Sequence, residues 1–181
     1  IPSDHSGIHF NNVITDNDSL NILNFEYIYN GGGVAIADFN NDSLPDIYFT
    51  GNMVPNCLYL NEGKLHFKDV TKAAGVNGNG KWSTGVSVID INNDGWLDLY
   101  VCASMKHDSA SRRNMLFVNQ GAGKDGVPVF KEMAAEYGVD DAGHSVMGAF
   151  FDYDNDGDLD LYVLTNVIDS AHYPSKYKPR T

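Results

Sequence analysis

At 181 residues, the chain is long enough for one domain with a sizeable core or for several units of a repeat. Its formal net charge of −12 at pH 7 argues against nucleic acid or an anionic membrane surface as the main partner, because both require a basic face. The sequence contains no run of about 18 apolar residues, so we expect no transmembrane helix.

The first element expected along the chain is a single strand over residues 8–15. Its sequence resembles that of a later segment, residues 65–71, which we expect to be the outermost strand of a sheet. No strand-like partner lies close to it in the sequence. We therefore expect it to complete a sheet whose other strands are distant.

An acidic loop follows at residues 38–46. Short runs of β-branched and aromatic residues, 34–38 and 46–50, flank it, so the loop is predicted to be the turn of a β-hairpin. Oxygen-bearing side chains at loop positions 1, 3, 5 and 9, with a backbone carbonyl at position 7, form a pattern that can wrap Ca²⁺. The predicted ligands are Asp38, Asn40, Asp42, Leu44 and Asp46.

The same loop occurs twice more, at residues 90–98 and 152–160. The second loop offers Asp90, Asn92, Asp94, Trp96 and Asp98, and the third offers Asp152, Asp154, Asp156, Asp158 and Asp160. We expect up to three structural Ca²⁺ ions. The third loop has Asp at all four side-chain positions, whereas the others have three Asp and one Asn, so it is predicted to bind calcium most tightly.

The loops are neither EF-hands nor ordinary turns. An EF-hand requires a bidentate Glu at position 12, where this chain has Phe49, Val101 and Val163. Asp, Asn and Gly are also common in simple turns, but a turn needs only one or two of them. Four fixed offsets, repeated three times, favour calcium.

Two further strand-like runs follow each of the first two hairpins. They are expected at residues 57–60 and 65–70, and at 115–118 and 129–133, with Asn-Glu-Gly or Asn-Gln-Gly turn signals between them. Four short strands recurring every 52 residues (Asp38 to Asp90) or 62 residues (Asp90 to Asp152) indicate the blades of a β-propeller.

The predicted fold is therefore all-β, a β-propeller fragment of four-stranded antiparallel blades. Blade one is expected at residues 31–72, blade two at 82–134, and a partial blade three at 144–166, followed by a polar tail at 167–181. Residues 1–181 would form the N-terminal part of one propeller domain, and the strand at 8–15 would belong to a closing blade. Exposed edge strands would then pair with the missing part of the propeller or with another chain.

The pattern Gly33-x4-Asp38-x-Asn40-x-Asp42-x3-Asp46, with its Asn-x-Gly hairpins, resembles the FG-GAP and VCBS repeats of integrin-α-like β-propellers. Residues 25–33, 82–85 and 150–151, which precede the loops, are similar to those of exported bacterial proteins whose propeller precedes an ASPIC/UnbV domain. The resemblance covers residues 7–166. It implies about seven blades, calcium in the hairpin loops, and a location outside the cell, on the outer-membrane surface or in the periplasm.

Two departures from the family pattern bear on the prediction. Ser43 replaces the glycine at position 6 of the first loop, where a positive φ is expected, and the ASPIC/UnbV domain has no counterpart in these residues. Loops with micromolar-to-millimolar calcium affinity fill permanently only outside the cytosol. Loop chemistry thus independently favours an exported protein.

Two smaller features leave alternatives open. Cys57 and Cys102 each adjoin an apolar strand-like run, which favours buried free thiols over a disulfide. Lys106, Arg112 and Arg113 form a local basic patch, interpreted as a solvated loop, with a ligand contact as the alternative.

The leading functional hypothesis is a non-catalytic, calcium-stabilised β-propeller module of an exported protein, which recognises a protein or glycan partner through its loops. No nucleophile or proton-transfer pair stands out. The alternative is the propeller part of an extracellular polysaccharide-degrading enzyme, because fold alone does not decide function. A cluster of His, Tyr, Arg or carboxylate residues at one end of the channel would favour the enzyme.

Overall fold

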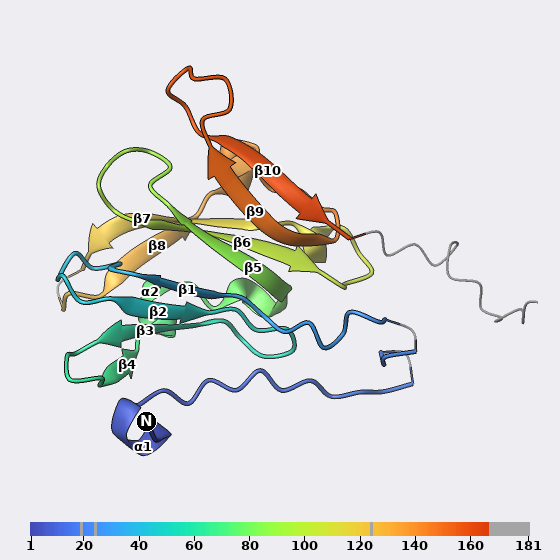
Figure 1. Cartoon of the computed structure of the whole chain (residues 1–181), viewed down its shortest axis with the longest axis horizontal. Coiled ribbons are helices and arrows are strands. Elements are labelled where there is room, and N and C mark those ends of the chain that lie inside the picture. Colours follow the sequence, from blue (N-terminus) through green and yellow to red (C-terminus); the bar gives the residue numbers. More distant parts are fainter. Residues whose placement is uncertain (19, 24, 124, 167–181) are drawn as a thin grey trace, which may run out of the picture.

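A computed structural model describes residues 1–18, 20–23, 25–123 and 125–166 as a series of antiparallel β-sheets (Figure 1). The first sheet contains β1 (Val34–Ala37), β2 (Asp46–Phe49), β3 (Cys57–Asn61) and β4 (Phe67–Asp69), and the second contains β5 (Trp82–Ile89), β6 (Asp98–Ser104), β7 (Met115–Ala122) and β8 (Pro128–Glu132). The third pairs β9 (Ser145–Phe151) with β10 (Asp160–Thr165). In each four-stranded sheet, the strands lie side by side in chain order.

This architecture confirms the all-β prediction and is consistent with a fragment of a β-propeller. The described residues form two four-stranded antiparallel sheets and one two-stranded sheet, and they do not close into a barrel. Short helical turns accompany the sheets: α1 (Ser3–Ser6), α2 (Thr71–Ala74), α3 (Ala134–Tyr137), η1 (Gly78–Gly80) and η2 (Ala110–Arg112). Among the described residues, no helix is long and apolar enough to cross a membrane. The tail predicted at residues 167–181 lies outside them.

The core lies between successive sheets. One cluster of buried side chains joins the first two sheets, with Phe39, Tyr48 and Phe117 among its largest members, and a smaller cluster around Tyr100 and Leu116 joins the second sheet to the third. All seven residues of β6 are buried, because sheets cover both of its faces. Each large apolar side chain buried in this way contributes roughly 1.5–3 kcal/mol.

Neighbouring sheets approach most closely along their first strands. A Cβ atom added at Gly85 would lie 2.4 Å from the carbonyl oxygen of Val146, so only glycine fits there. Beside it, the Thr84 hydroxyl donates to the carbonyl of Ser145 at 2.8 Å. The Thr50 hydroxyl likewise donates to the carbonyl of Thr84, at 2.5 Å. Together these contacts join the three sheets along one line.

Residues 8–15, predicted to be a strand of a closing blade, form no strand within the described structure, and their pairing with strands outside this chain stays a prediction. No ladder is present there in the described structure, and the segment instead runs along the first sheet, held by side chains. The ring of Phe10 stacks on Phe49 with centroids 4.9 Å apart, and the Asn12 amide donates to the Asn52 side chain at 2.7 Å. Without a strand beside it in register, the segment cannot form the backbone pairs that define a strand.

Two local predictions can also be checked. The strand expected at 65–70 begins only at Phe67, because Lys64 and Leu65 have positive φ values of 52° and 63° and form the turn before β4. Both cysteines are free, Cys57 half-buried and Cys102 buried, so the thiol interpretation is confirmed and the disulfide is not. Burial raises the pKa of the Cys102 thiol to about 12.

Candidate metal centres

Each acidic loop connects the first two strands of a sheet. The last paired residues before each loop are Ala37 and Asp46 in the first sheet, Ile89 and Asp98 in the second, and Phe151 and Asp160 in the third. The residues at positions 4 and 6 have positive φ in every loop: Asn41 and Ser43, Asn93 and Gly95, Asn155 and Gly157. Ser43, with φ of 70°, therefore adopts the conformation expected for the glycine that it replaces.

The aspartate at position 1 holds the curled backbone of its loop. In the first loop, the two carboxylate oxygens of Asp38 accept the N–H groups of Asp42 at 3.1 Å and Ser43 at 2.7 Å. Asp90 and Asp152 make the same pair of contacts in the other loops, at 2.9–3.2 Å. The position-5 carboxylates accept the N–H groups of Leu44, Trp96 and Asp158 at 2.8–2.9 Å. Predicted ligands at positions 1, 5 and 7 are thus linked within each loop.

The aspartate at position 9 has a different environment. Asp46 is fully buried, and its two oxygens accept the N–H groups of Phe39 and Asn61, both at 2.9 Å. Burial raises the pKa of Asp46 to about 6, although the two N–H contacts oppose that rise. In the second loop, Asp98 accepts from Ile91 at 2.9 Å and Asn119 at 2.7 Å, and burial likewise raises its pKa. In each of the two four-stranded sheets, the aspartate at position 9 therefore connects the loop to the third strand by a hydrogen bond.

Sequence reasoning missed the role of Asn119, which lies within β7, the third strand of the second sheet. Asn119 is fully buried, and its amide donates to the carbonyl of Leu97 in its own loop at 3.2 Å and to that of Phe39 in the first loop at 2.9 Å. The Asn41 amide also donates to the carbonyl of Gly95 at 3.3 Å. The first two loops are therefore hydrogen-bonded to each other. The available signal was the Asn-x-Gly motif, which was interpreted only as a turn.

Position 3 distinguishes the third loop from the others. The amide of Asn40 donates to Asp42 at 2.9 Å, and that of Asn92 donates to Asp94 at 2.8 Å. In the third loop, Asp152, Asp154 and Asp156 offer carboxylate oxygens that all lie within 4.8 Å of one another, and all three residues are exposed. Three clustered carboxylates repel one another, and a set made only of oxygen atoms suits a hard cation such as Ca²⁺. These residues fit the predicted metal.

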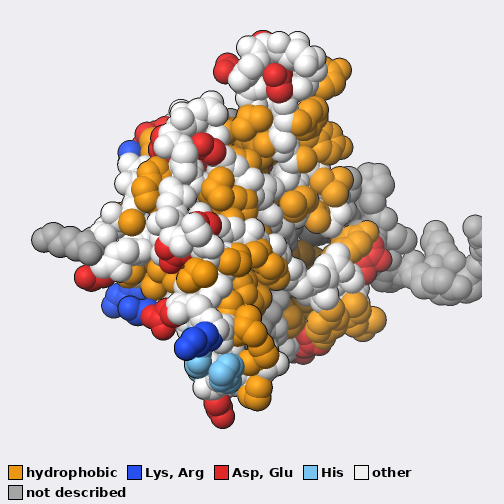
Figure 2. Space-filling model, turned by 60° about the vertical axis from the view of Figure 1, so that its left-hand side comes forward, with side chains coloured by type: hydrophobic (Ala, Val, Ile, Leu, Met, Phe, Trp, Pro, Cys, Tyr) orange, Lys and Arg blue, Asp and Glu red, His pale blue; other side chains and the backbone are white. Residues whose placement is uncertain are grey.

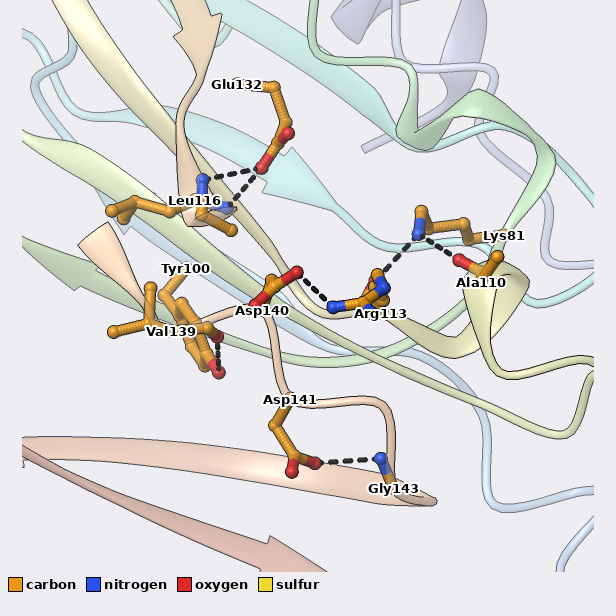
Figure 3. A network of polar contacts seen from close by, with 11 residues as sticks. Lys81, Tyr100, Ala110, Arg113, Leu116, Glu132, Val139, Asp140, Asp141 and Gly143 are labelled. Carbon is orange, nitrogen blue, oxygen red and sulfur yellow. Dashed lines mark hydrogen bonds and ion pairs between the residues drawn. The ribbon is translucent and has the colours of Figure 1, made fainter. Parts of the chain in front are cut away.

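A second polar network lies away from the loops, where the second sheet leads into the third (Figure 3). Lys81 donates to the carbonyls of Ala110 at 3.1 Å and Arg113 at 2.8 Å, while Arg113 pairs with Asp140. Burial lowers the pKa of Lys81. Glu132 accepts the N–H groups of Leu116 and Ala134 in the same region. The network fixes connections between elements.

The predicted basic patch belongs to this region. The guanidinium of Arg112 donates to the carbonyls of Lys106 and His107, both at 2.7 Å, and of Ala142 at 3.1 Å. Arg113 and Arg112 are thus both engaged within the chain. The structure favours the loop interpretation, with the added finding that these side chains brace the loops.

Fold and loops together define a class: an array of four-stranded antiparallel sheets in which an acidic hairpin loop joins the first two strands of each sheet. The FG-GAP-like repeat family matches residues 38–101, from the first acidic loop into β6. This match supports the FG-GAP part of the resemblance seen in the sequence. The ASPIC/UnbV context remains a prediction.

The chain is also similar to proteins named cartilage acidic protein 1. It is 30% identical to the mouse protein over 139 residues and 29% identical to the human protein over 139 residues, in each case covering 72% of this chain and 20% of the relative. Identity to the Xenopus tropicalis protein is 26% over 136 residues, covering 74% of this chain and 20% of the relative. The chain thus spans a fifth of the length of these relatives.

Proposed function

We propose that the chain is a calcium-stabilised, non-catalytic binding module of an exported protein. The observation that carries the calcium assignment is the third loop, where three exposed aspartates bring their carboxylate oxygens within 4.8 Å of one another. The same backbone curl in all three loops extends the assignment to the first two. The match to the FG-GAP-like repeat family supports a repeat module of this kind.

Calcium would act on stability in this proposal. Its positive charge would offset the repulsion among Asp152, Asp154 and Asp156, and the side-chain oxygens at positions 1, 3, 5 and 9 with the carbonyl at position 7 would hold it. Because the unfolded chain lacks the curled loop, the free energy of binding adds to the free energy of unfolding.

Calcium titration of chelator-treated protein tests the assignment. We expect binding of up to three ions, one for each loop, with a rise in Tm, and loss of one ion in Asp156→Ala and in Asp94→Ala. Asp125→Ala is the matched control, because Asp125 is an exposed acidic residue in the β7–β8 connection, outside the loops. Unchanged Tm and no bound ion in the wild type would contradict the proposal.

The partner is proposed to be a protein or a glycan that contacts the loop end of the sheets. Two observations support a common surface: the three loops lie toward the same side of the molecule (Figure 1), and the first two are hydrogen-bonded to each other. The relatives are named for cartilage and for acidity, and this chain is also acidic, with a net charge of −12. From the similarity to these relatives, we propose that this chain is also part of an exported protein.

Screening the protein against glycan and matrix-protein arrays, in calcium and in chelator, tests the partner. We expect calcium-dependent capture that Asp156→Ala weakens and Asp125→Ala does not. Capture that is equal in calcium and chelator would contradict recognition through calcium-ordered loops. Secretion of the parent protein, followed in cell fractions, tests the location separately.

A further inference from the structure

A hollow of about 230 Å³ lies at the end of the first two sheets that is opposite the acidic loops. Trp82 begins β5 and Ser104 ends β6, and these two residues pair there, whereas the acidic loop joins the other ends of the same strands. We propose that this hollow binds a small aromatic carboxylate. The site is separate from the loop end and does not depend on calcium.

The walls of the hollow come from the two four-stranded sheets and from the segment that leads into β1. Met53 follows β2 of the first sheet, Trp82 and Met105 lie at the end of the second sheet, and Leu20 and Phe25 precede β1. None of the described lining residues belongs to the third sheet. The hollow is thus formed between two sheets that each have all four strands, and not at the edge of the two-stranded sheet.

The segment that leads into β1 is held in place by hydrogen bonds. It lies at the right of Figure 1, away from the acidic loops. Asn17 and Leu20 exchange backbone hydrogen bonds at 2.9 and 3.1 Å, and the N–H group of Thr15 donates to the sulfur of Met53 at 3.2 Å. These contacts position Leu20 and Met53, so the hollow is formed before a ligand binds, as ligand sites usually are.

Trp82 supplies a hydrogen-bond donor. The side chain is only 4% exposed, and buried indole N–H groups usually have a hydrogen-bond partner. The indole N–H of Trp82 has no acceptor among the described residues, and its nitrogen is not fully enclosed by protein atoms. A ligand acceptor in the hollow would provide the partner.

Lys106 supplies a positive charge at the same hollow. A ligand contact was the alternative interpretation of the basic patch formed by Lys106, Arg112 and Arg113, and both arginines are engaged within the chain. The ammonium group of Lys106, by contrast, is exposed and makes no hydrogen bond or ion pair with the described residues. Two donors, one of them charged, favour an anionic acceptor, and a carboxylate has an oxygen for each.

The turn that carries Lys106 is strained. Met105 has a φ of 61°, and the Lys106 N–H donates to the carbonyl of Ser104 at 2.7 Å, which is the hydrogen bond of a γ-turn. A γ-turn whose central residue has positive φ is rare and strained. Arg112 braces it through the carbonyls of Lys106 and His107. Such strain concentrates at ligand sites, and here the turn places Met105 and Lys106 in one wall of the hollow.

The rest of the lining defines the body of the ligand. Leu20, Phe25, Met53 and Met105 present apolar surface, and methionine sulfur makes favourable contacts with aromatic rings. The volume is below the roughly 300–1,000 Å³ that is usual for ligand pockets. The ligand is therefore expected to have one aromatic ring, with its carboxylate on a short chain.

An anion is better placed in this hollow than at the loop end. Acidic side chains occupy the tip of the β9–β10 hairpin at the top of Figure 2. Near the hollow, acidic side chains of the adjoining segments are already engaged: Asp16 accepts the Tyr29 hydroxyl at 2.5 Å, and Asp108 accepts the Ser111 N–H at 2.8 Å. Local charge therefore favours the hollow, although the whole chain is acidic.

Titration with phenylbutyrate, followed in the proton–nitrogen NMR spectrum of the full chain, tests the proposal. The chain has two tryptophans, Trp82 at the hollow and Trp96 in the second acidic loop, and Trp96→Phe assigns their indole signals. We expect a saturable shift of the Trp82 indole N–H and no shift of the Trp96 signal. Neutral phenylbutanol should bind about 10-fold more weakly, because it cannot accept a hydrogen bond as an anion.

The C-terminus of a peptide that ends in phenylalanine carries the same ring and carboxylate. Acetylglycylphenylalanine, titrated in the same way, separates the two sources. Tighter binding than that of phenylbutyrate would assign the site to peptide C-termini, and weaker binding would assign it to free aromatic acids.

A variant of the exposed lysine provides the second arm. Lys106→Gln should weaken phenylbutyrate binding about 10-fold and leave phenylbutanol binding unchanged. Lys72→Gln is the matched control, an exposed lysine outside the hollow, and should change neither. Absence of a saturable shift at Trp82, equal affinity for acid and alcohol, or unchanged acid binding in Lys106→Gln would overturn the proposal. Titration in calcium and in chelator keeps this outcome separate from that of the calcium proposal.

Discussion

The first two acidic loops and the third have the same backbone path but different supports. The first two have an asparagine at position 3 that hydrogen-bonds to the position-5 aspartate, and each has a position-9 aspartate buried against a third strand. The third has an aspartate at position 3, and every residue from Asp152 to Asp160 is exposed. If calcium binds as proposed, the third loop should depend on it most, because protein contacts supply part of that support in the other two loops.

The largest expected difference lies in the sheets that carry the loops. Leu99 and Leu161 occupy equivalent positions in β6 and β10, but Leu99 is fully buried and Leu161 only partly. Leu99→Ala should lower the free energy of unfolding by about 2–5 kcal/mol, and Leu161→Ala by roughly half of that or less. Urea denaturation of both variants measures this, and equal losses would mean that the third sheet is as well supported as the second.

The next largest effect on stability is expected from Asn119, whose side chain joins the first two loops. Asn119→Ala removes donors to Phe39 and Leu97 from a buried site and should cost about 1–3 kcal/mol. Asn61→Ala is the matched control, because the Asn61 amide donates only within its own sheet, to Pro45 at 2.9 Å, so its cost should be smaller. Chemical denaturation in chelator measures both. A larger loss in Asn61→Ala would contradict the role given to the link between the loops.

The buried aspartate of the first loop, Asp46, predicts a pH dependence of stability. Burial raises the pKa of Asp46 from 3.8 to about 6, so between these pH values the folded state binds more protons than the unfolded state. In chelator, the free energy of unfolding should therefore fall as pH rises from 4 to 6, by about 2 kcal/mol, and this contribution should level off above pH 6. Urea denaturation across this range should show a shallower slope in Asp46→Asn. An identical slope in that variant would rule out Asp46 as the source.

The smallest effect is expected from exchanging the residues at position 3 of the loops. Asp154→Asn should raise stability in chelator by less than about 1 kcal/mol, because it replaces one of the clustered carboxylates with an amide, and should weaken calcium binding. Asn40→Asp should do the reverse in the first loop, where it removes the amide donor to Asp42. Thermal melts with and without calcium measure both. Shifts of the same sign in the two variants would remove position 3 as the cause of the difference.

Repeated local patterns made much of the fold predictable. The apolar runs beside the loops, together with the missing Glu at position 12, indicated hairpins rather than helices, and the described strands follow them closely. Residues 8–15 form no strand within the described structure, because strand formation depends on a partner as well as on the local sequence. The position of Leu65 was missed because a non-glycine residue there adopts positive φ.

Site geometry was less predictable than the ligand pattern. The offsets identified the acidic side chains, but not the burial of Asp46 and Asp98, which depends on strands far away in the sequence. The contact from Asn119 to Phe39 spans 80 residues and crosses between sheets. A single sequence contains no signal for such a pairing.

The contacts along the first strands also indicate where residues can be inserted into the chain. Thr50, Thr84 and Gly85 fix the spacing of the sheets at one side, whereas the hairpins that join third to fourth strands lie at the other. The β7–β8 connection is exposed at Asp125 and Gly126. That connection is therefore the place where an inserted epitope or fluorescent label should leave the rest of the array undisturbed.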